Sequence, residues 1–408
     1  MQSPFNLKEL YSFTKNPRSK PTYLGYTNGF AYGFSLNALQ LLVALYAIDL
    51  GFDMSKMGII IAAPAFFMVA LRLPGGAISD RFGEKVILRF SFVTLVICGV
   101  IAAYSSTLWP LIIAQLFNGA SRSVYWSAGQ SYISRSSPGD AGKVMGRQLS
   151  FESAGGIIGA IIAGYCAEFF DYKTAFIMAS VAAIVGFSIT SSLPALPRKD
   201  QVRKFLASFA PAREMLFKRS LLHAHMVAFM AASYAGLMGG LFIAFFREVG
   251  YGEGETSIIR SLNSIGLTVL AYVFGTILAK LGSRNTALIG ITLTGALSIG
   301  IAASGDLPII PIVLMTVSGM TFGSLRALYP SLAAQNSTDS QRAMALSVVS
   351  LYWAIAMLLS PLVFGFIANS TSITFALFTF GGFSIIAGLL SPLLYLYGRK
   401  GITPSTDQ

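Results

Sequence analysis

The sequence predicts an all-α polytopic membrane protein with twelve transmembrane helices in two pseudo-symmetric six-helix bundles. Of its 408 residues, 54% are hydrophobic and only 11% are charged, whereas roughly a quarter of the residues in a soluble domain are charged. About a dozen apolar stretches are each long enough to cross a hydrocarbon core of about 30 Å. Landmarks in the first half recur in the second at an offset of 199 or 200 residues. These observations exclude an ordinary soluble enzyme.

The expected helices follow one another with short connections. In order, they lie at 26–48, 56–78, 86–106, 109–132, 146–167, 174–195, 221–246, 256–279, 285–304, 307–332, 343–367 and 374–397. We therefore expect an N-terminal six-helix bundle at 1–195, a cytoplasmic basic linker at 196–220 and a C-terminal six-helix bundle at 221–408. The linker is either a solvated connection that fixes topology or a segment that lies on anionic lipid.

The basic residues orient the helices. The net charge is +12, and the segments on the side of the N-terminus hold 22 of the 29 Lys and Arg residues, while the opposite side holds only Lys56, Lys173 and Arg247. By the positive-inside rule, both termini are cytoplasmic in a multi-pass protein of the cell membrane, plasma or inner. Since the basic residues form no stripe interleaved with aromatic ones, we expect no nucleic-acid partner. The polar N-terminal 25 residues do not resemble a cleaved signal peptide.

The two halves show signs of an internal duplication, which is common in transporter folds. Asp49-Leu50-Gly51-Phe52 ends the first stretch, and Glu248-Val249-Gly250-Tyr251 ends the seventh. Three further glycine pairs keep nearly the same offset: Gly76 and Gly275, Gly83 and Gly282, Gly119 and Gly319. A nearly constant shift over several loops and helices favours two related bundles.

The segment after the second stretch carries the most specific motif. It reads GAISDRFGEK from Gly76 to Lys85 and resembles the G-x-x-x-D-R-x-G-[RK]-[RK] signature of the major facilitator superfamily. A glycine at the first position permits close helix approach, and the acid can accept hydrogen bonds from helix N-termini or a basic partner. The gating motif that this resemblance implies consists of Gly76, Asp80, Arg81, Gly83 and Lys85.

Two departures from the signature are visible. Glu84 stands where the family usually has a basic residue, and the second copy, from Gly275 to Arg284, lacks the acid. Control of gating is therefore expected from the N-terminal copy.

The resemblance implies a secondary transporter that works by rocking alternating access. It also implies a central cavity lined mainly by the first, second, fourth and fifth helices of each half. The chain carries no phosphate-binding loop, metal-ligand cluster or nucleophile constellation, so we expect no enzymatic activity, no cofactor and no metal.

The drug:proton antiporters of this superfamily carry an Arg four residues before a Gly in helix 4 and a G-x-x-x-G-P pattern in helix 5. Here Gln115 stands four residues before Gly119, and Ala160 replaces the expected proline. Both changes weaken the antiporter assignment. The pair Gly155 and Gly159 is interpreted first as a packing face between helices.

Five ionisable residues lie well inside the apolar stretches: Arg72, Arg122, Glu152, Arg260 and Arg326. Each costs at least about 2.5–3.5 kcal/mol at the bilayer centre, so each should face a cavity or a partner. Because guanidinium groups bind carboxylates and phosphates as a fork, the excess of arginines favours an anionic substrate.

Arg122 and Glu152 are expected at similar depth on neighbouring helices. Glu152 is then either a proton-coupling site, responsive to a substrate anion that recruits Arg122, or half of a permanent salt bridge. Arg326 is favoured for a substrate or gating role. Arg72 has a structural alternative, and Arg260 could extend to the outer interface.

Polar and aromatic residues on the expected cavity helices complete the candidate substrate site. Besides Arg122 and Arg326, it contains Asn37, Gln40, Trp126, Tyr352 and Trp353. His223 and His225, at the start of the seventh stretch, are expected to be wet interface residues.

The sequence thus favours a carrier of a small organic solute, anionic or amphipathic, with protons as a further partner. A multidrug or lipophilic-solute:proton antiporter is the alternative within the same class. A non-transporting membrane receptor on a carrier fold is the alternative from another class. We expect a monomer in the lipid bilayer.

Overall fold

The computed structural model describes residues 20–71, 82–136, 141–194, 210–305, 307, 309–338 and 341–399. Arg72, Gly76, Asp80 and Arg81 of the predicted site lie outside these ranges, as does most of the basic linker. All regular structure within them is helical.

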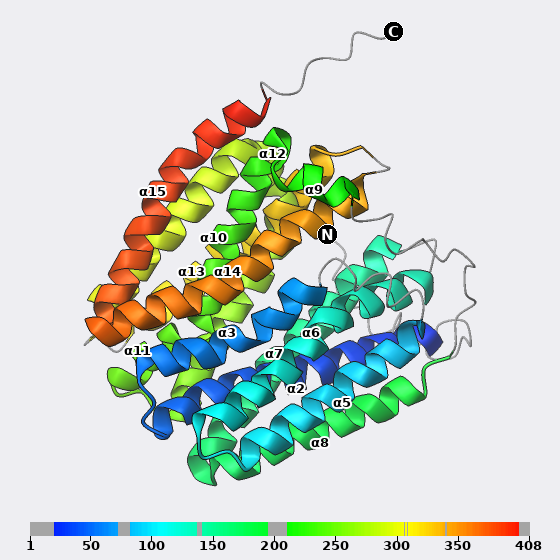
Figure 1. The fold of residues 1–408 in the computed structure, drawn as a ribbon, viewed down its shortest axis with the longest axis vertical. Coiled ribbons are helices and arrows are strands. Elements are labelled where there is room, and N and C mark those ends of the chain that lie inside the picture. The colour runs from blue at the N-terminus through cyan, green and yellow to red at the C-terminus, as the bar shows by residue number, and fades with distance from the viewer. Residues whose placement is uncertain are drawn as a thin grey trace.

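The first group of helices forms one side of the molecule (Figure 1). Its members are α2 (Lys20–Asp49), α3 (Met54–Leu71), α5 (Glu84–Ala103), α6 (Leu108–Ser136), α7 (Ala141–Phe169) and α8 (Tyr172–Ser191). The second group begins with the short helix α9 (Ala210–Leu216) and the 3₁₀ turn η4 (Arg219–Leu221). It continues with α10 (Leu222–Met238), α11 (Leu241–Glu248), α12 (Glu253–Ala303), α13 (Ile310–Gln335), α14 (Arg342–Ser370) and α15 (Ile373–Arg399).

These helices confirm the all-α membrane fold, with one difference in continuity. The seventh predicted helix is broken at Gly239 and Gly240 into α10 and α11. The eighth and ninth share the label α12, but Gly282, whose φ of 72° and ψ of 164° are not helical, separates them between the predicted ends.

Ten described helices are long and apolar enough to cross a membrane. The remaining two predicted spans are α6 and the part of α12 before Gly282. They fall short because polar residues interrupt them, including Gln115, Asn118 and Arg122 in α6. Polar groups are costly in contact with lipid, so these two helices are suited to the protein interior.

Glycines repeat their structural roles in the two halves. Among the described residues, positive φ angles occur only at Gly51, Gly83, Gly250 and Gly282, which are two of the pairs predicted from the offset. The left-handed region favours glycine because it has no Cβ. Left-handed glycines therefore occupy corresponding positions in each half, after α2 and α11 and at the start of α5 and the bend of α12.

Close helix crossings repeat in the same way. A Cβ added at Gly119 of α6 would collide with the backbone of Pro64 in α3, and one at Gly319 of α13 would collide with the backbone of Asn263 in α12. The predicted packing face of α7 is confirmed, since Gly155 and Gly159 lie against the backbone of α2.

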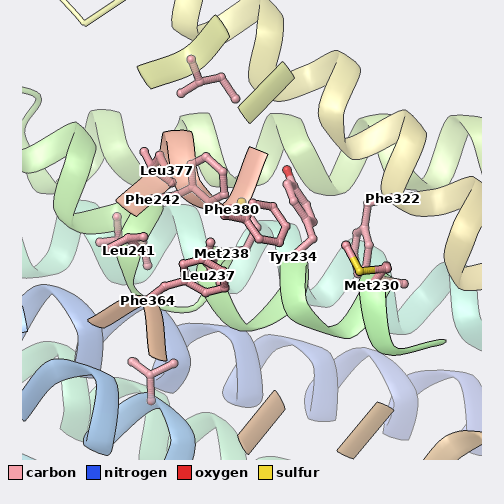
Figure 2. Close-up of a cluster of buried hydrophobic side chains, with 14 of the residues drawn as sticks. Met230, Tyr234, Leu237, Met238, Leu241, Phe242, Phe322, Phe364, Leu377 and Phe380 are labelled. Carbon is pink, nitrogen blue, oxygen red and sulfur yellow. The ribbon is translucent and has the colours of Figure 1, made fainter. Parts of the chain in front are cut away.

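The buried apolar side chains form two large clusters. One is centred on α2, α5 and α8. The larger one surrounds α10, extends into α11, α13, α14 and α15, and includes Leu41 and Leu45 of α2 and Met57 of α3, so it crosses between the two groups. Figure 2 shows the latter, with Tyr234 beside Phe322 and Phe242 packed near Phe380. The Tyr234 hydroxyl is paired with Ser318 Oγ at 2.6 Å and accepts a hydrogen bond from Asn263 Nδ2 at 2.7 Å. A buried hydroxyl that is paired in this way avoids the cost of desolvation.

The two groups meet mainly through α3 with α14 and α7 with α12 (Figure 1). A Cβ at Gly58 of α3 would meet the backbone of Pro361 and Gly365 in α14, and one at Gly164 of α7 would meet Ser257 in α12. These contacts involve the starts of α3 and α12 and the ends of α7 and α14. They therefore close one end of the molecule. We call it the outer end, because it lies opposite the helix ends that lead to the two chain termini.

Replacing Gly119 with valine should lower the free energy of unfolding by about 1–3 kcal/mol, because the new side chain collides with the backbone of Pro64. The measurement is the thermal unfolding midpoint of the purified protein in detergent. Gly382→Val in α15 is the matched control, since a Cβ there would meet nothing within 4 Å. Equal midpoints for the two variants would contradict the tight α3–α6 crossing.

Candidate functional site

Arg326 and Trp126 meet at the centre of the molecule from opposite halves. The Arg326 guanidinium carbon, on α13, lies 5.5 Å from the centre of the Trp126 ring on α6. Such a cation–π contact is most favourable where water is displaced. The structure therefore brings together two of the residues predicted to bind substrate.

Glu152 on α7 adds a negative charge to this centre. The charge of Arg326 acts directly on its carboxylate. Sequence depth suggested Arg122 as the partner of Glu152, and the structure adds a cation from the other half. The interaction therefore spans the interface between the halves, so it can change when the halves move.

Arg260 forms a second contact between the halves. From α12, its Nη2 donates to Gln40 Oε1 at 3.2 Å and its Nη1 donates to the Asn37 carbonyl at 3.3 Å, both on α2. It does not extend to the outer interface, so that alternative is wrong. The charge of Arg122 lies close enough to act on Arg260, which places two guanidinium groups from opposite halves near each other.

A cavity of about 190 Å³ lies between α6 and α7. It is lined by Tyr125, Trp126, Gly129, Gln130, Met145, Gly146, Gln148, Leu149 and Glu152. Trp126 and Glu152 were predicted as site residues. Gln130, Met145, Gln148 and Leu149 were missed, because an amide or apolar residue near a helix end has no distinguishing pattern in the sequence.

Tyr352 and Trp353 do not line this cavity. The Tyr352 hydroxyl donates to the Leu216 carbonyl at 2.8 Å, and its ring stacks on His225 with centroids 4.1 Å apart. Trp353 packs against Tyr329, with ring centroids 5.4 Å apart. In this conformation both residues make packing contacts within the second group.

The expectation that His223 and His225 are wet interface residues is wrong. Only 4% and 3% of their surfaces are exposed. His223 Nε2 is paired with Ser391 Oγ at 2.9 Å, and His225 is covered by the Tyr352 ring. The start of α10 is buried because α14 and α15 pack over it.

The described end of the gating motif ties helices of the first group together. Gly83 has φ of 84°, and Lys85 Nζ donates to the Leu193 carbonyl at 2.7 Å. Glu84, the departure from the signature, forms an ion pair with Arg135 and accepts a hydrogen bond from Ser131 Oγ at 2.8 Å. The acid at this position is thus explained by the basic residue in the last turn of α6.

The outer end carries hydrogen bonds in both directions between the halves. Glu168 of α7 accepts the backbone N–H of Gly254, in the first turn of α12, at 2.7 Å. Glu253 accepts the Tyr172 hydroxyl at 3.2 Å and pairs with Arg247 at 2.7 Å. Free N–H groups at a helix start need acceptors. When the outer end is closed, the first half supplies an acceptor to the start of α12, and if the halves separated, water would have to replace it.

The family model described as Major Facilitator Superfamily matches residues 26–252 and 225–407. The chain belongs to the Major Facilitator Superfamily. It is therefore a multi-pass membrane transporter of the secondary class and not an enzyme, as the sequence predicted.

Similar proteins are themselves transport or resistance proteins by name. Tetracycline resistance protein, class B, of Escherichia coli is 24% identical over 77% of this chain and 79% of its own length. Inner membrane transport protein YnfM of Escherichia coli is 28% identical, but the alignment spans about half of each protein, 49% of this chain and 47% of the relative. The nucleoside transporter NupG has the same fold, with a TM-score of 0.75 at 16% identity over 93% of this chain and 99% of that chain.

Replacing Glu168 with glutamine should shift the protein towards a state that is open at the outer end. The charge-assisted hydrogen bond to Gly254 contributes about 1.5–3 kcal/mol, so exposure of the α7–α12 interface should rise about ten- to a hundredfold. The measurement is the labelling rate of Ser257→Cys by a membrane-impermeant maleimide, in a Cys166→Ser background.

Glu255→Gln is the matched control. Glu255 is also in the first turn of α12, but it accepts the N–H of Gly252 within its own half. If the two variants label at the same rate, the bond between Glu168 and Gly254 does not hold the outer end closed.

Proposed function

We propose that this protein transports a small organic anion by alternating access of the bundle at 1–195 against the bundle at 221–408, with 196–220 as the linker. The observation that carries the proposal is that Arg260 and Arg326 of the second half both reach across to the first half, where Arg260 donates to Asn37 and Gln40 and Arg326 lies over Trp126. The charge of Arg122, from the first half, also acts on Arg260. Like charges repel strongly where water is scarce, so an anion bound among these arginines would replace repulsion with attractive contacts and would stabilise the approach of the halves.

The charge balance of the centre supports an anion. Among the residues that the structure describes within the middle of the spans, three arginines, Arg122, Arg260 and Arg326, outnumber the single carboxylate of Glu152. Guanidinium groups bind carboxylates and phosphates through paired, directional hydrogen bonds. Asn37 and Gln40 serve this site by holding Arg260 in place.

The conformation agrees with one step of a transport cycle. The described contacts between the halves run from the central arginines to the outer end, where α3 meets α14 and α7 meets α12. The cavity at Trp126 and Glu152 lies on the other side of these contacts, between the end of α6 and the start of α7. By the positive-inside rule this is the cytoplasmic side, and both termini lie in the cytoplasm. The protein is then a monomer in the plasma or inner membrane.

We propose Glu152 as the proton-coupling residue. The charge of Arg326 acts on the Glu152 carboxylate, and an anion that attracts this arginine would leave the carboxylate without its counter-charge. A buried carboxylate without a cation is costly unless it takes a proton. Binding of the anion and of a proton therefore support each other, which is the requirement for symport.

Export of lipophilic drugs is the second candidate. It is favoured by similarity to relatives named tetracycline resistance protein and quinolone resistance protein. Gln115 and Ala160, which replace the family's antiporter residues, favour the anion carrier instead. Stabilisation by lipophilic cations alone, lost in Glu152→Gln, would support the exporter.

Alanine at Arg122, Arg260 or Arg326 should weaken binding of organic anions about ten- to a hundredfold, because each substitution removes one charged hydrogen-bond donor. Thermal stabilisation of the purified protein by a panel of organic anions gives the affinities. The control is Arg89→Ala, since Arg89 donates to Ser191 at 3.2 Å within the first group and does not reach the centre. Unchanged anion binding in all three central variants would overturn the anion site.

Glutamine at Glu152 should abolish accumulation of the anion driven by a pH gradient, because the amide cannot carry the proton. Exchange of labelled for unlabelled anion should persist, since that process needs no net proton movement. Both are measured in liposomes that contain the purified variant. Accumulation driven by the pH gradient at the wild-type rate would rule out Glu152 as the coupling residue.

A further inference from the structure

The cavity between α6 and α7 belongs entirely to one half. All of its lining residues lie on these two helices of the first group, whereas Arg326 and Arg260 come from the second group. When the halves rock, the walls of this cavity keep their positions relative to each other. The contacts with the two arginines change instead.

Two aromatic side chains on α6 give the cavity rigid walls. The Tyr125 ring stacks on Tyr32 with centroids 3.3 Å apart, and its hydroxyl donates to Asn28 Oδ1 at 3.0 Å. Trp126 is held by the Arg326 guanidinium over its ring. Tyr125 is only 1% exposed and forms the back of the wall, so the accessible ring surface is that of the half-buried Trp126. A flat surface that is already in place costs a ligand little entropy.

The other walls provide apolar contact and neutral hydrogen-bonding groups. Met145 and Leu149 supply the apolar surface, and Gln130 and Gln148 supply amides. Gln148 is buried, with 5% of its surface exposed, and packs beside Gly129, where a Cβ would lie 3.2 Å from Nε2. This composition matches a ring system that carries a few polar atoms.

Gly146 keeps part of this cavity open. It is exposed, and a Cβ added there would meet nothing within 4 Å. A larger side chain at this position would therefore occupy the space of the cavity without colliding with the helices.

We propose that this cavity is a subsite for the flat, uncharged part of the transported solute, which makes the substrate class an aromatic organic anion. The inference rests on the proposed function. The ring lies against Trp126, with Tyr125 behind it in the wall, and the anionic group points towards Arg326, which lies over Trp126 from the other half. The first half thus selects the ring and keeps it during the cycle, while the second half recognises the charge.

The test compares three carboxylates that differ in their apolar part: 2-naphthoate, cyclohexanecarboxylate and acetate. Binding to the full-length purified protein is measured by calorimetry. In the wild type, naphthoate should bind at least about tenfold more tightly than cyclohexanecarboxylate, because stacking on fixed rings needs a flat partner.

Gly146→Leu should weaken naphthoate binding about tenfold or more and leave acetate unchanged. Gly146→Ala should also weaken naphthoate binding, by a smaller factor. This variant keeps the test valid if leucine at this position disturbs folding. Gly382→Leu is the matched control, since this glycine is also open to added atoms but lies on α15, away from the cavity, and should bind all three carboxylates like the wild type.

The outcomes separate the two proposals. Equal affinity for naphthoate and cyclohexanecarboxylate, or full naphthoate affinity in both Gly146 variants, would overturn the ring subsite while anion transport stands. Binding of tetraphenylphosphonium but of none of the carboxylates would overturn the anion carrier and the subsite together.

Discussion

The cost of placing arginine side chains among apolar helices governs the centre of this molecule. A guanidinium group keeps its charge in every protein environment, so it must be given acceptors, a counter-charge or an aromatic face. Arg260 obtains a carbonyl and an amide oxygen, and Arg326 obtains the Trp126 ring and the charge of Glu152. In each case the partner lies in the other half, so the same requirement that stabilises the arginine also holds the halves together.

Glycine has the complementary role in the surrounding helices. Hydrophobic burial does not favour one helix contact over another in lipid, so close packing determines which faces meet. The backbones approach at Gly119 in one half and at Gly319 in the other. Rigid bundles built in this way can move as units. The contacts between them, which combine close crossings at Gly58 and Gly164 with polar contacts of the arginines, are the ones that must separate when they move.

Much of the fold could be predicted from the sequence because the spans and their turns follow simple physical rules. Apolar length predicted the helices, and the 199-residue offset paired Gly51 with Gly250, which both adopt the left-handed conformation in the structure. The partner of Glu152 could not be predicted in the same way. Depth along a helix can be counted in residues. The approach of Arg326 to Glu152 depends instead on how the two halves pack against each other, and a local sequence pattern does not predict that packing.

Residues near helix ends gave the least reliable predictions. Tyr352 and His225 stack on each other because α14 crosses the start of α10, and neither residue type reveals such a crossing in sequence. Arg135 and Glu84 show the opposite case: an acid that departs from the family motif is explained once its basic partner on α6 is known.

The carboxylate of Glu168, which accepts the Gly254 N–H at the start of α12, also links closure of this end to the ions in the surrounding water. Aligned peptide groups give the beginning of a helix a partial positive charge, and a carboxylate from the other half neutralises it when the outer end closes. Dissolved ions compete for both groups once they separate, and this competition strengthens with ionic strength. The balance between closed and open outer ends therefore depends on the salt concentration of the surroundings as well as on the solute.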